Sequence, residues 1–229
     1  MTGLHITMHD IQDTWDSQMQ QSLLEWHLQS GIKADLAIIA GYFGDDAPLV
    51  DRVKAGVQQG IFGIYNHTWG HIDLTTLTKD EIRESILSSQ QKLKDIFGLE
   101  PTTVVPPYWS INQDVIDVCA ELGLQIQKLE PYILLFPQFV EGGWAQINPE
   151  TFKIEVQDTI ATHGMVEIAV HHQGITDINL YSQALELCLE PEWMDTVSGI
   201  VGLGAGLLTL GLAVTVTVGM LRGDGGSHG

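Results

Sequence analysis

Short apolar runs alternate with longer segments of helical period along most of the chain, and this alternation constrains the fold more than any other feature. Several helical segments stop at glycines, which are common helix end signals, as at Gly31, Gly60 and Gly98. The pattern is typical of β/α units around a parallel sheet or barrel. Strands are expected at residues 4–8, 34–40, 61–65, 102–105, 124–127 and 165–170. Helices are expected at residues 15–30, 48–59, 78–98, 113–122 and 149–163.

Two parts of the chain are harder to interpret. Residues 131–143 fit neither a helical nor a strand pattern. Residues 149–163 could form a connecting helix or a mixed segment. The helix that begins near Thr78 has the clearest signal, because Thr78 and Glu81 form the sequence signature of a capping box.

The composition fits one catalytic-size domain with a short appendage. The chain has 229 residues, of which 44% are hydrophobic, so it can bury an ordinary core. The formal net charge is −19, with only ten lysines and arginines, and this argues against nucleic acid as a partner. Cys119 and Cys188 lack the spacing of a zinc site or a redox pair, so we expect two buried thiols.

Polar side chains gather directly after the expected strands. In β/α folds these strand ends form the carboxyl-end rim, where the chemistry is usually placed. The residues at this rim are Asp10, His67, His71, Tyr108 and His171. We therefore expect them to lie near one another in the fold.

His67 and His71 are four residues apart, a spacing that allows both imidazoles to converge on one ion. The pair alone is weak evidence, because the chain has nine histidines. A surface turn with one histidine capping a helix would give the same spacing. Both interpretations stay open on this motif alone.

The other polar rim residues also allow more than one role. Asp10 could be a metal ligand, a general base or a helix cap, and Asp13 is the better cap for the helix that follows. His171 and His172 end the last expected strand. One of them could protonate a leaving group, or both could be satisfied by backbone carbonyls.

Taken in chain order, these motifs resemble the polysaccharide deacetylase family (NodB homology, carbohydrate esterase family four), in a divergent prokaryotic branch. The resemblance covers roughly residues 4–175. The segments that carry it are Thr7-Met8-His9-Asp10, His67-Thr68-Trp69-Gly70-His71, Val105-Pro106-Pro107-Tyr108 and Val170-His171.

The resemblance implies an α/β fold, a distorted (β/α)7-type barrel, with Asp10, His67 and His71 holding Zn²⁺ or another divalent transition metal. Three protein ligands leave positions open for water and substrate, and the metal would activate that water. The implied reaction removes acyl groups, N-acetyl foremost, from an oligo- or polysaccharide. His171 would be the acid that protonates the amine. Pro107, Tyr108, Trp69 and His172 are the expected substrate-binding residues.

Two positions depart from the family pattern. The first acidic residue of the opening motif, the general base of the family, is His9 here, and the arginine that orients this acid is Val105. An imidazole can accept a proton near neutral pH, so His9 could replace the base, or it could become a fourth ligand and close the site. Three alternatives follow: an active hydrolase, a related domain that binds metal or glycan without turnover, and an unrelated β/α protein with structural histidines.

The chain is expected to divide into a catalytic domain at residues 1–193 and an apolar tail at residues 194–229. Residues 197–221 hold no charge and are long enough for a helix that crosses a bilayer, which would make the protein membrane-associated. A buried element or an oligomer contact is the alternative. The first residues have no signal-peptide pattern. Which sugar, which acyl group, which metal and which oligomeric state apply stays open.

Overall fold

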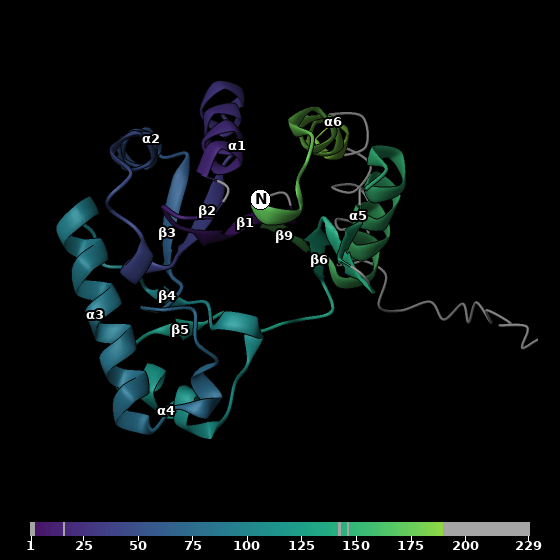
Figure 1. The fold of residues 1–229 in the computed structure, drawn as a ribbon. Helices are drawn as coiled ribbons and strands as arrows, with labels where there is room; N and C mark the ends of the chain where they lie inside the picture. Colours follow the sequence, from purple (N-terminus) through teal and green to yellow (C-terminus); the bar gives the residue numbers. More distant parts are fainter. Residues whose placement is uncertain (1–2, 16, 142, 146, 190–229) are drawn as a thin grey trace, which may run out of the picture.

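The computed structural model describes residues 3–15, 17–141, 143–145 and 147–189. Its centre is a seven-stranded sheet with the strand order β5-β4-β3-β2-β1-β9-β6, in which all neighbouring strands are parallel. The strands are β1 Leu4–Ile11, β2 Ala34–Ile38, β3 Phe62–Asn66, β4 Thr103–Val104, β5 Gln125–Ile126, β6 Ile133–Phe136 and β9 Val166–His171. The sheet curls so that its helices lie around the outside (Figure 1). The expected α/β fold of the (β/α)7 type is confirmed.

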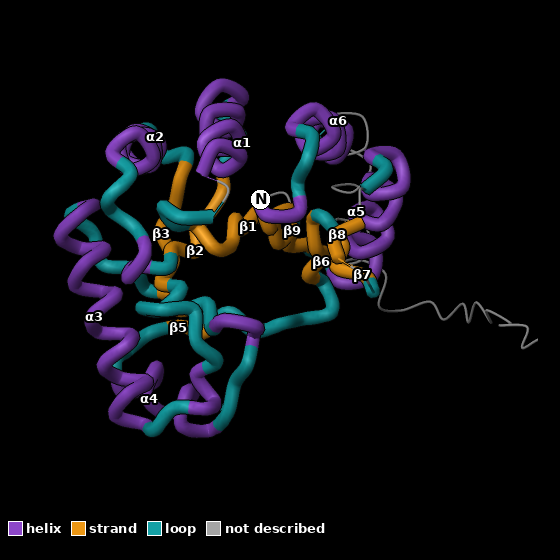
Figure 2. Tube along the Cα trace, in the orientation of Figure 1, coloured by secondary structure: helices purple, strands orange, loops and turns teal. Residues whose placement is uncertain are grey.

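Six α-helices connect or follow the strands in the described part of the chain (Figure 2). They are α1 Ser17–Ser30, α2 Ala47–Gln58, α3 Lys79–Phe97, α4 Gln113–Glu121, α5 Pro149–His163 and α6 Ile178–Cys188. The apolar face of β1, with Ile6 and Met8, packs in one buried cluster with Leu23 and Leu24 of α1. The core thus lies between the sheet and its outer helices, as the alternating sequence pattern requires.

The helix boundaries follow local chemistry. Thr78 accepts a hydrogen bond from the Glu81 amide while Glu81 bonds back to Thr78, so the expected capping box is present at the start of α3. The helix ends at Gly98, whose φ of 72° belongs to the left-handed region that glycine adopts without strain. Asn148 caps α5, which is a continuous helix. The alternative of a mixed segment at residues 149–163 is therefore wrong.

Four features differ from the sequence-based expectations. Strand β1 extends to Ile11, so Asp10 lies inside an irregular strand end and does not follow the strand. Residues 131–143, which showed no pattern, contain β6 and β7 Gln138–Val140, and β7 pairs with the short strand β8 Gly143–Ala145. Helix α6 was not expected. The described side-chain hydrogen bond of Asp13 goes to the Asp45 amide before α2, at 2.6 Å, so its proposed role as the cap of α1 is not supported.

The inner face of the sheet is polar, in contrast to the outer face. The Thr7 hydroxyl donates to Glu167 at 2.7 Å, and Gln127 also donates to Glu167. His5 lies 2.5 Å from the Asp35 carboxylate, and this hydrogen bond is the main reason that the pKa of His5 rises to about 9. These contacts tie β1, β2 and β9 together inside the curl of the sheet.

The expected apolar tail at 194–229, including residues 197–221, lies outside the described residues. Within the described ranges, no helix is both long enough and apolar enough to span a bilayer. The division into residues 1–193 and 194–229 stays a prediction. Cys119 and Cys188 are both free and buried, as expected.

Candidate metal centre and surrounding cavity

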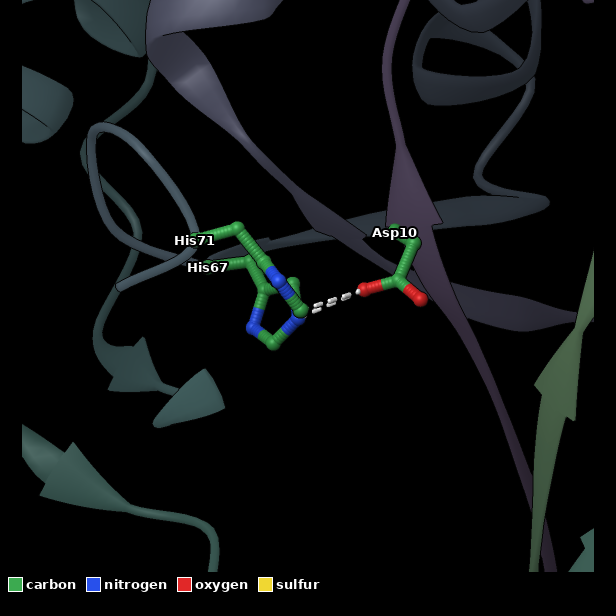
Figure 3. A group of neighbouring side chains, drawn as sticks. All are labelled: Asp10, His67 and His71. Atoms are coloured by element: carbon green, nitrogen blue, oxygen red, sulfur yellow. Dashed lines mark hydrogen bonds and ion pairs between the residues drawn. The ribbon is translucent and has the colours of Figure 1, made fainter. Parts of the chain in front are cut away.

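Three side chains from two distant parts of the chain meet at the carboxyl end of the sheet (Figure 3). Asp10 comes from the end of β1, and His67 and His71 come from the loop after β3. The Oδ1 atom of Asp10 lies 3.0 Å from Nε2 of His67 and 2.9 Å from Nε2 of His71. One ligand atom from each residue therefore falls within 4.8 Å of the other two. The convergence expected for these three residues is present.

The hydrogen bonding of His67 fits a cation between its Nε2 atom and Oδ1 of Asp10. Its Nδ1 lies 2.6 Å from the backbone carbonyl of Val105, which only a protonated Nδ1 can satisfy. A neutral His67 then carries a lone pair on Nε2, and that lone pair faces the Asp10 carboxylate. Two lone-pair-bearing atoms directed at each other are favourable only around a cation or a proton. An outer carbonyl that fixes the tautomer in this way is the usual arrangement for a metal-ligating histidine.

Asp10 is held as a carboxylate by its neighbours. Burial by itself would raise its pKa, but the close contacts with the imidazoles of His67 and His71 hold the pKa of this carboxyl well below its usual range. The other oxygen, Oδ2, accepts a hydrogen bond from Nε2 of Gln173 at 3.0 Å. Gln173 thereby leaves Oδ1 free to face the two imidazoles.

The backbone around the site adopts a conformation that side chains other than glycine rarely take. Among the described residues, the non-glycine positions with positive φ are Asp10, Thr68, His71, Tyr108 and Trp109, with values between 50° and 66°. Each costs of the order of 1–3 kcal/mol and persists only where surrounding contacts enforce it. Asn66 supplies one such contact, because its side chain accepts from the Thr68 amide at 2.8 Å and donates to Ile86 of α3.

The three side chains lie in a cavity of about 280 Å³. Its other lining residues are mostly aromatic: His9, Pro106, Tyr108, Trp109, Trp144 and His171. Tyr108 is 65% exposed, and its ring lies 4.9 Å from that of His71. A larger cavity of about 740 Å³ lies at the opposite, amino ends of β1 to β3. It borders Leu189, the last described residue, and holds none of the expected site residues, so we place the chemistry in the smaller cavity.

His9 and His171 form a stack beside the candidate metal centre. Their ring centroids are 4.9 Å apart, and Trp144 stacks on the other face of His171 at 5.3 Å. Burial, followed by the neighbouring His171, lowers the pKa of His9 well below its usual value. Burial also lowers the pKa of His171 to about 4. Both rings are therefore neutral at pH 7 and can accept a proton.

The family model described as polysaccharide deacetylase matches residues 4–127, more than half of the chain. The chain belongs to the polysaccharide deacetylase family.

Curated relatives match this polysaccharide deacetylase family member over part of its length. Chitin deacetylase 1 of Cryptococcus neoformans is 41% identical over 58 residues, which are 25% of this chain and 12% of the relative. A peptidoglycan-N-acetylglucosamine deacetylase of Listeria monocytogenes is 30% identical over 111 residues, which are 48% of this chain and 22% of the relative. The chain thus spans less than a quarter of the length of either relative.

Solved structures of the family share the fold. A family 4 carbohydrate esterase from Streptomyces lividans, in complex with acetate, has a TM-score of 0.52 and 21% identity, covering 86% of this chain and 88% of its own. A family pseudoenzyme from Bacillus anthracis has a TM-score of 0.56 and 14% identity, covering 81% of this chain and 60% of its own. At these identities the likeness concerns the fold alone.

The structure brings some of the expected deacetylase residues into the cavity and leaves others outside. His9, Tyr108 and His171 line the cavity, whereas Pro107 is buried next to the lining residue Pro106. Trp69 is 43% exposed outside the cavity, with Nζ of Lys92 5.5 Å from its ring centroid. His172 is buried, and its Nε2 lies 3.2 Å from the Trp15 carbonyl, so it too is outside the cavity.

Three residues at the site were not predicted from the sequence: Gln173, Trp109 and Trp144. Trp109 follows Tyr108 directly, so its position after the double proline was a usable signal. Trp144 lies on the short strand β8, directly after residues 131–143, which showed no pattern. Gln173 lies two residues after His171, and nothing in the sequence indicates its contact with Asp10.

Proposed function

We propose that this chain removes acyl groups, N-acetyl foremost, from a carbohydrate polymer with the help of a divalent metal ion. The proposal rests above all on the meeting of Asp10, His67 and His71 in an aromatic-lined cavity. Membership of the polysaccharide deacetylase family supports the reaction class. The names of the partial relatives, which act on chitin or on N-acetylglucosamine of peptidoglycan, support N-acetylglucosamine polymers as the substrate.

Asp10, His67 and His71 would hold the ion, which we propose to be Zn²⁺ or another divalent transition metal. One carboxylate and two imidazoles suit this group of metals, and the set leaves positions open for other ligands. A bound ion of this kind would polarise the acyl oxygen and lower the pKa of a water molecule. The Val105 carbonyl and Gln173 would keep the His67 ring and the Asp10 carboxylate in place.

The cavity walls suit a sugar ring. Tyr108, Trp109 and Trp144 line the cavity, and the negative face of an aromatic ring attracts the weakly positive C–H groups of a pyranose. A cavity of about 280 Å³ accommodates a small acyl group and part of one ring. Tyr108, being largely exposed, would contact the part of the sugar nearest to solvent.

We assign His9 as the base and His171 as the acid. A neutral imidazole can take the proton that the attacking water loses, and once protonated it is an acid of suitable strength for an amine leaving group. The proton that the water loses to His9 would reach the amine through His171, whose ring stacks on that of His9 at 4.9 Å, so no other proton is consumed. Amide hydrolysis then needs no histidine that is charged beforehand.

A second candidate function is binding of metal or glycan without turnover. One observation favours it: His9 stands where the resemblance places the acidic base, and its Nε2 has no hydrogen-bond partner among the described residues. An imidazole fixed in a stack between other rings has a different reach from a carboxylate. The two candidates differ only in turnover.

Acetate release distinguishes them. The 229-residue chain, loaded with Zn²⁺, is incubated with N-acetylglucosamine oligomers, and released acetate is measured. General acid–base groups contribute about 10²- to 10⁴-fold, so we expect His171→Ala to lower kcat by that factor. His163→Ala, at the exposed end of α5, is the matched control and should retain wild-type activity. No acetate release by the wild-type protein from any acylated glycan would refute the enzyme and leave the binding function.

A further inference from the structure

The cavity of about 740 Å³ at the amino ends of β1 to β3 has no part in the proposed reaction, because the candidate metal centre lies at the other end of the sheet. We call it the amino-end cavity. Its large apolar lining residues are Leu4, Ile6, Ile32, Ile61, Phe62 and Leu189. Apolar surface gains free energy when apolar atoms replace the water next to it. The amino-end cavity therefore suits an apolar occupant.

Three charged side chains also line the amino-end cavity: His5, Lys33 and Asp35. His5 and Asp35 satisfy each other, since their side chains are 2.5 Å apart. Lys33 is exposed, and no described carboxylate lies within ion-pair distance of it. The cavity therefore combines an apolar wall with one positive charge that the described residues do not neutralise.

Hydrogen bonds of His27 fix the end of the described chain beside this cavity. Its Nδ1 donates to the Ile32 carbonyl at 2.8 Å, so its Nε2 accepts from the Tyr181 hydroxyl at 2.6 Å. His27 of α1 thereby joins α6, which contains Tyr181, to the cavity residue Ile32. Leu189 directly follows α6 and is itself part of the cavity wall. Residues 190–229 therefore continue from the wall of the amino-end cavity.

The sequence after Leu189 is complementary to the cavity in charge and in polarity. Residues 190–196 carry three carboxylates and no positive charge, opposite in sign to Lys33. Residues 197–221 carry no charge. A chain of this length, seven residues, spans at most about 25 Å when extended, so the uncharged stretch begins within that distance of Leu189.

We propose that the uncharged stretch at residues 197–221 docks in the amino-end cavity of its own chain, with the acidic residues 190–196 next to Lys33. The first large apolar side chains of the stretch, Val197, Ile200 and Val201, are the ones that enter. Burial of apolar surface on both sides supplies the free energy. The ion pair with Lys33 adds little to it, because exposed pairs are weak, but it sets the direction of the chain.

Thiol labelling of the 229-residue chain tests the docking. Ile32→Cys places a thiol in the cavity wall, and the native Cys119 and Cys188 are buried, so they react slowly. Full burial of one Val, Leu or Ile side chain changes an equilibrium by more than about tenfold. We therefore expect a second substitution, Val201→Asp, to accelerate maleimide labelling of the Ile32→Cys chain about tenfold.

Two controls separate docking from general effects of the substitution. Ser227→Asp adds the same charge beyond the uncharged stretch and should leave the labelling rate of the Ile32→Cys chain unchanged. Ile154→Cys places the thiol at an exposed position on α5 and should react at one rate in all backgrounds. Ile61→Cys, in the same cavity wall, serves as the probe if Ile32→Cys fails to fold, as judged by circular dichroism.

Each other occupant gives a different result. Equal labelling rates with and without Val201→Asp would overturn the docking. Protection of the Ile32→Cys thiol that grows with protein concentration would mean that a second copy covers the cavity, and would overturn it too. A chain that sediments with phosphatidylcholine vesicles, with its cavity thiol labelled as fast as in the Val201→Asp background, would place the stretch in a bilayer instead. Protection that is independent of concentration and unchanged by vesicles would support the proposal.

Discussion

Gln173→Ala should weaken metal binding without removing a ligand. The Gln173 amide donates to Oδ2 of Asp10 at 3.0 Å, and Asp10 is only 8% exposed, so water replaces this contact poorly. A hydrogen bond to a charged group contributes about 1.5–3 kcal/mol. Loss of a residue that supports a metal ligand usually costs about 10- to 100-fold in affinity, which is about 1.4–2.7 kcal/mol. The two estimates agree, so we expect a Zn²⁺ dissociation constant 10 to 100 times higher.

Competition with a chromophoric chelator measures this dissociation constant directly, independent of turnover. Gln138→Ala is the matched control, because Gln138 donates at 3.1 Å to the exposed carboxylate of Glu155, away from the cavity. Its Zn²⁺ affinity should equal that of the wild type. An unchanged affinity in Gln173→Ala would refute the idea that this amide positions Asp10 as a ligand.

Two further predictions concern stability. Burial lowers the pKa of His27 from 6.5 to about 4, so as pH falls the unfolded chain takes up this proton first. This stabilisation of about 3 kcal/mol is fully present above about pH 6.5 and is lost as the pH falls towards 4. His27→Gln should remove this part of the pH dependence of the free energy of unfolding, measured with urea. An unchanged pH dependence in the variant would contradict the prediction. Gly56 faces the Phe62 ring, and a Cβ there would lie 1.9 Å from it. Gly56→Ala should therefore lower the free energy of unfolding by about 1–3 kcal/mol. Gly60→Ala is the comparison variant: Gly60 has open space around it but a φ of 69°, so this substitution tests backbone strain without a clash.

The sequence predicted most of the scaffold because its signals are local. The capping box at Thr78 and the glycine at 98 determine α3 within one turn at either end. Helix α6 was missed although its buried residues Tyr181, Ala184, Leu185 and Cys188 have helical spacing. The β7–β8 hairpin is too short for any periodicity to show.

The metal ligands could be proposed from spacing and family motifs, since His67 and His71 are close in sequence and Asp10 ends a strand. The contacts that support these ligands could not be predicted, because such contacts join distant parts of the chain. Gln173 reaches Asp10 across 163 positions, and the Val105 carbonyl reaches His67 across 38. His172 shows the opposite limit: its neighbour His171 ends β9 and lines the cavity, while His172 begins the short 3-10 helix after the strand and contacts the Trp15 carbonyl.

Metal analysis of the purified chain tests the central claim most directly. After dialysis against Zn²⁺ and removal of the excess, elemental analysis should find one ion per wild-type chain. The double variant Asp10→Ala, His67→Ala should hold none, and His163→Ala should hold one. A wild-type chain that binds no ion, or a double variant that still binds one, would show that these three side chains do not form a metal centre.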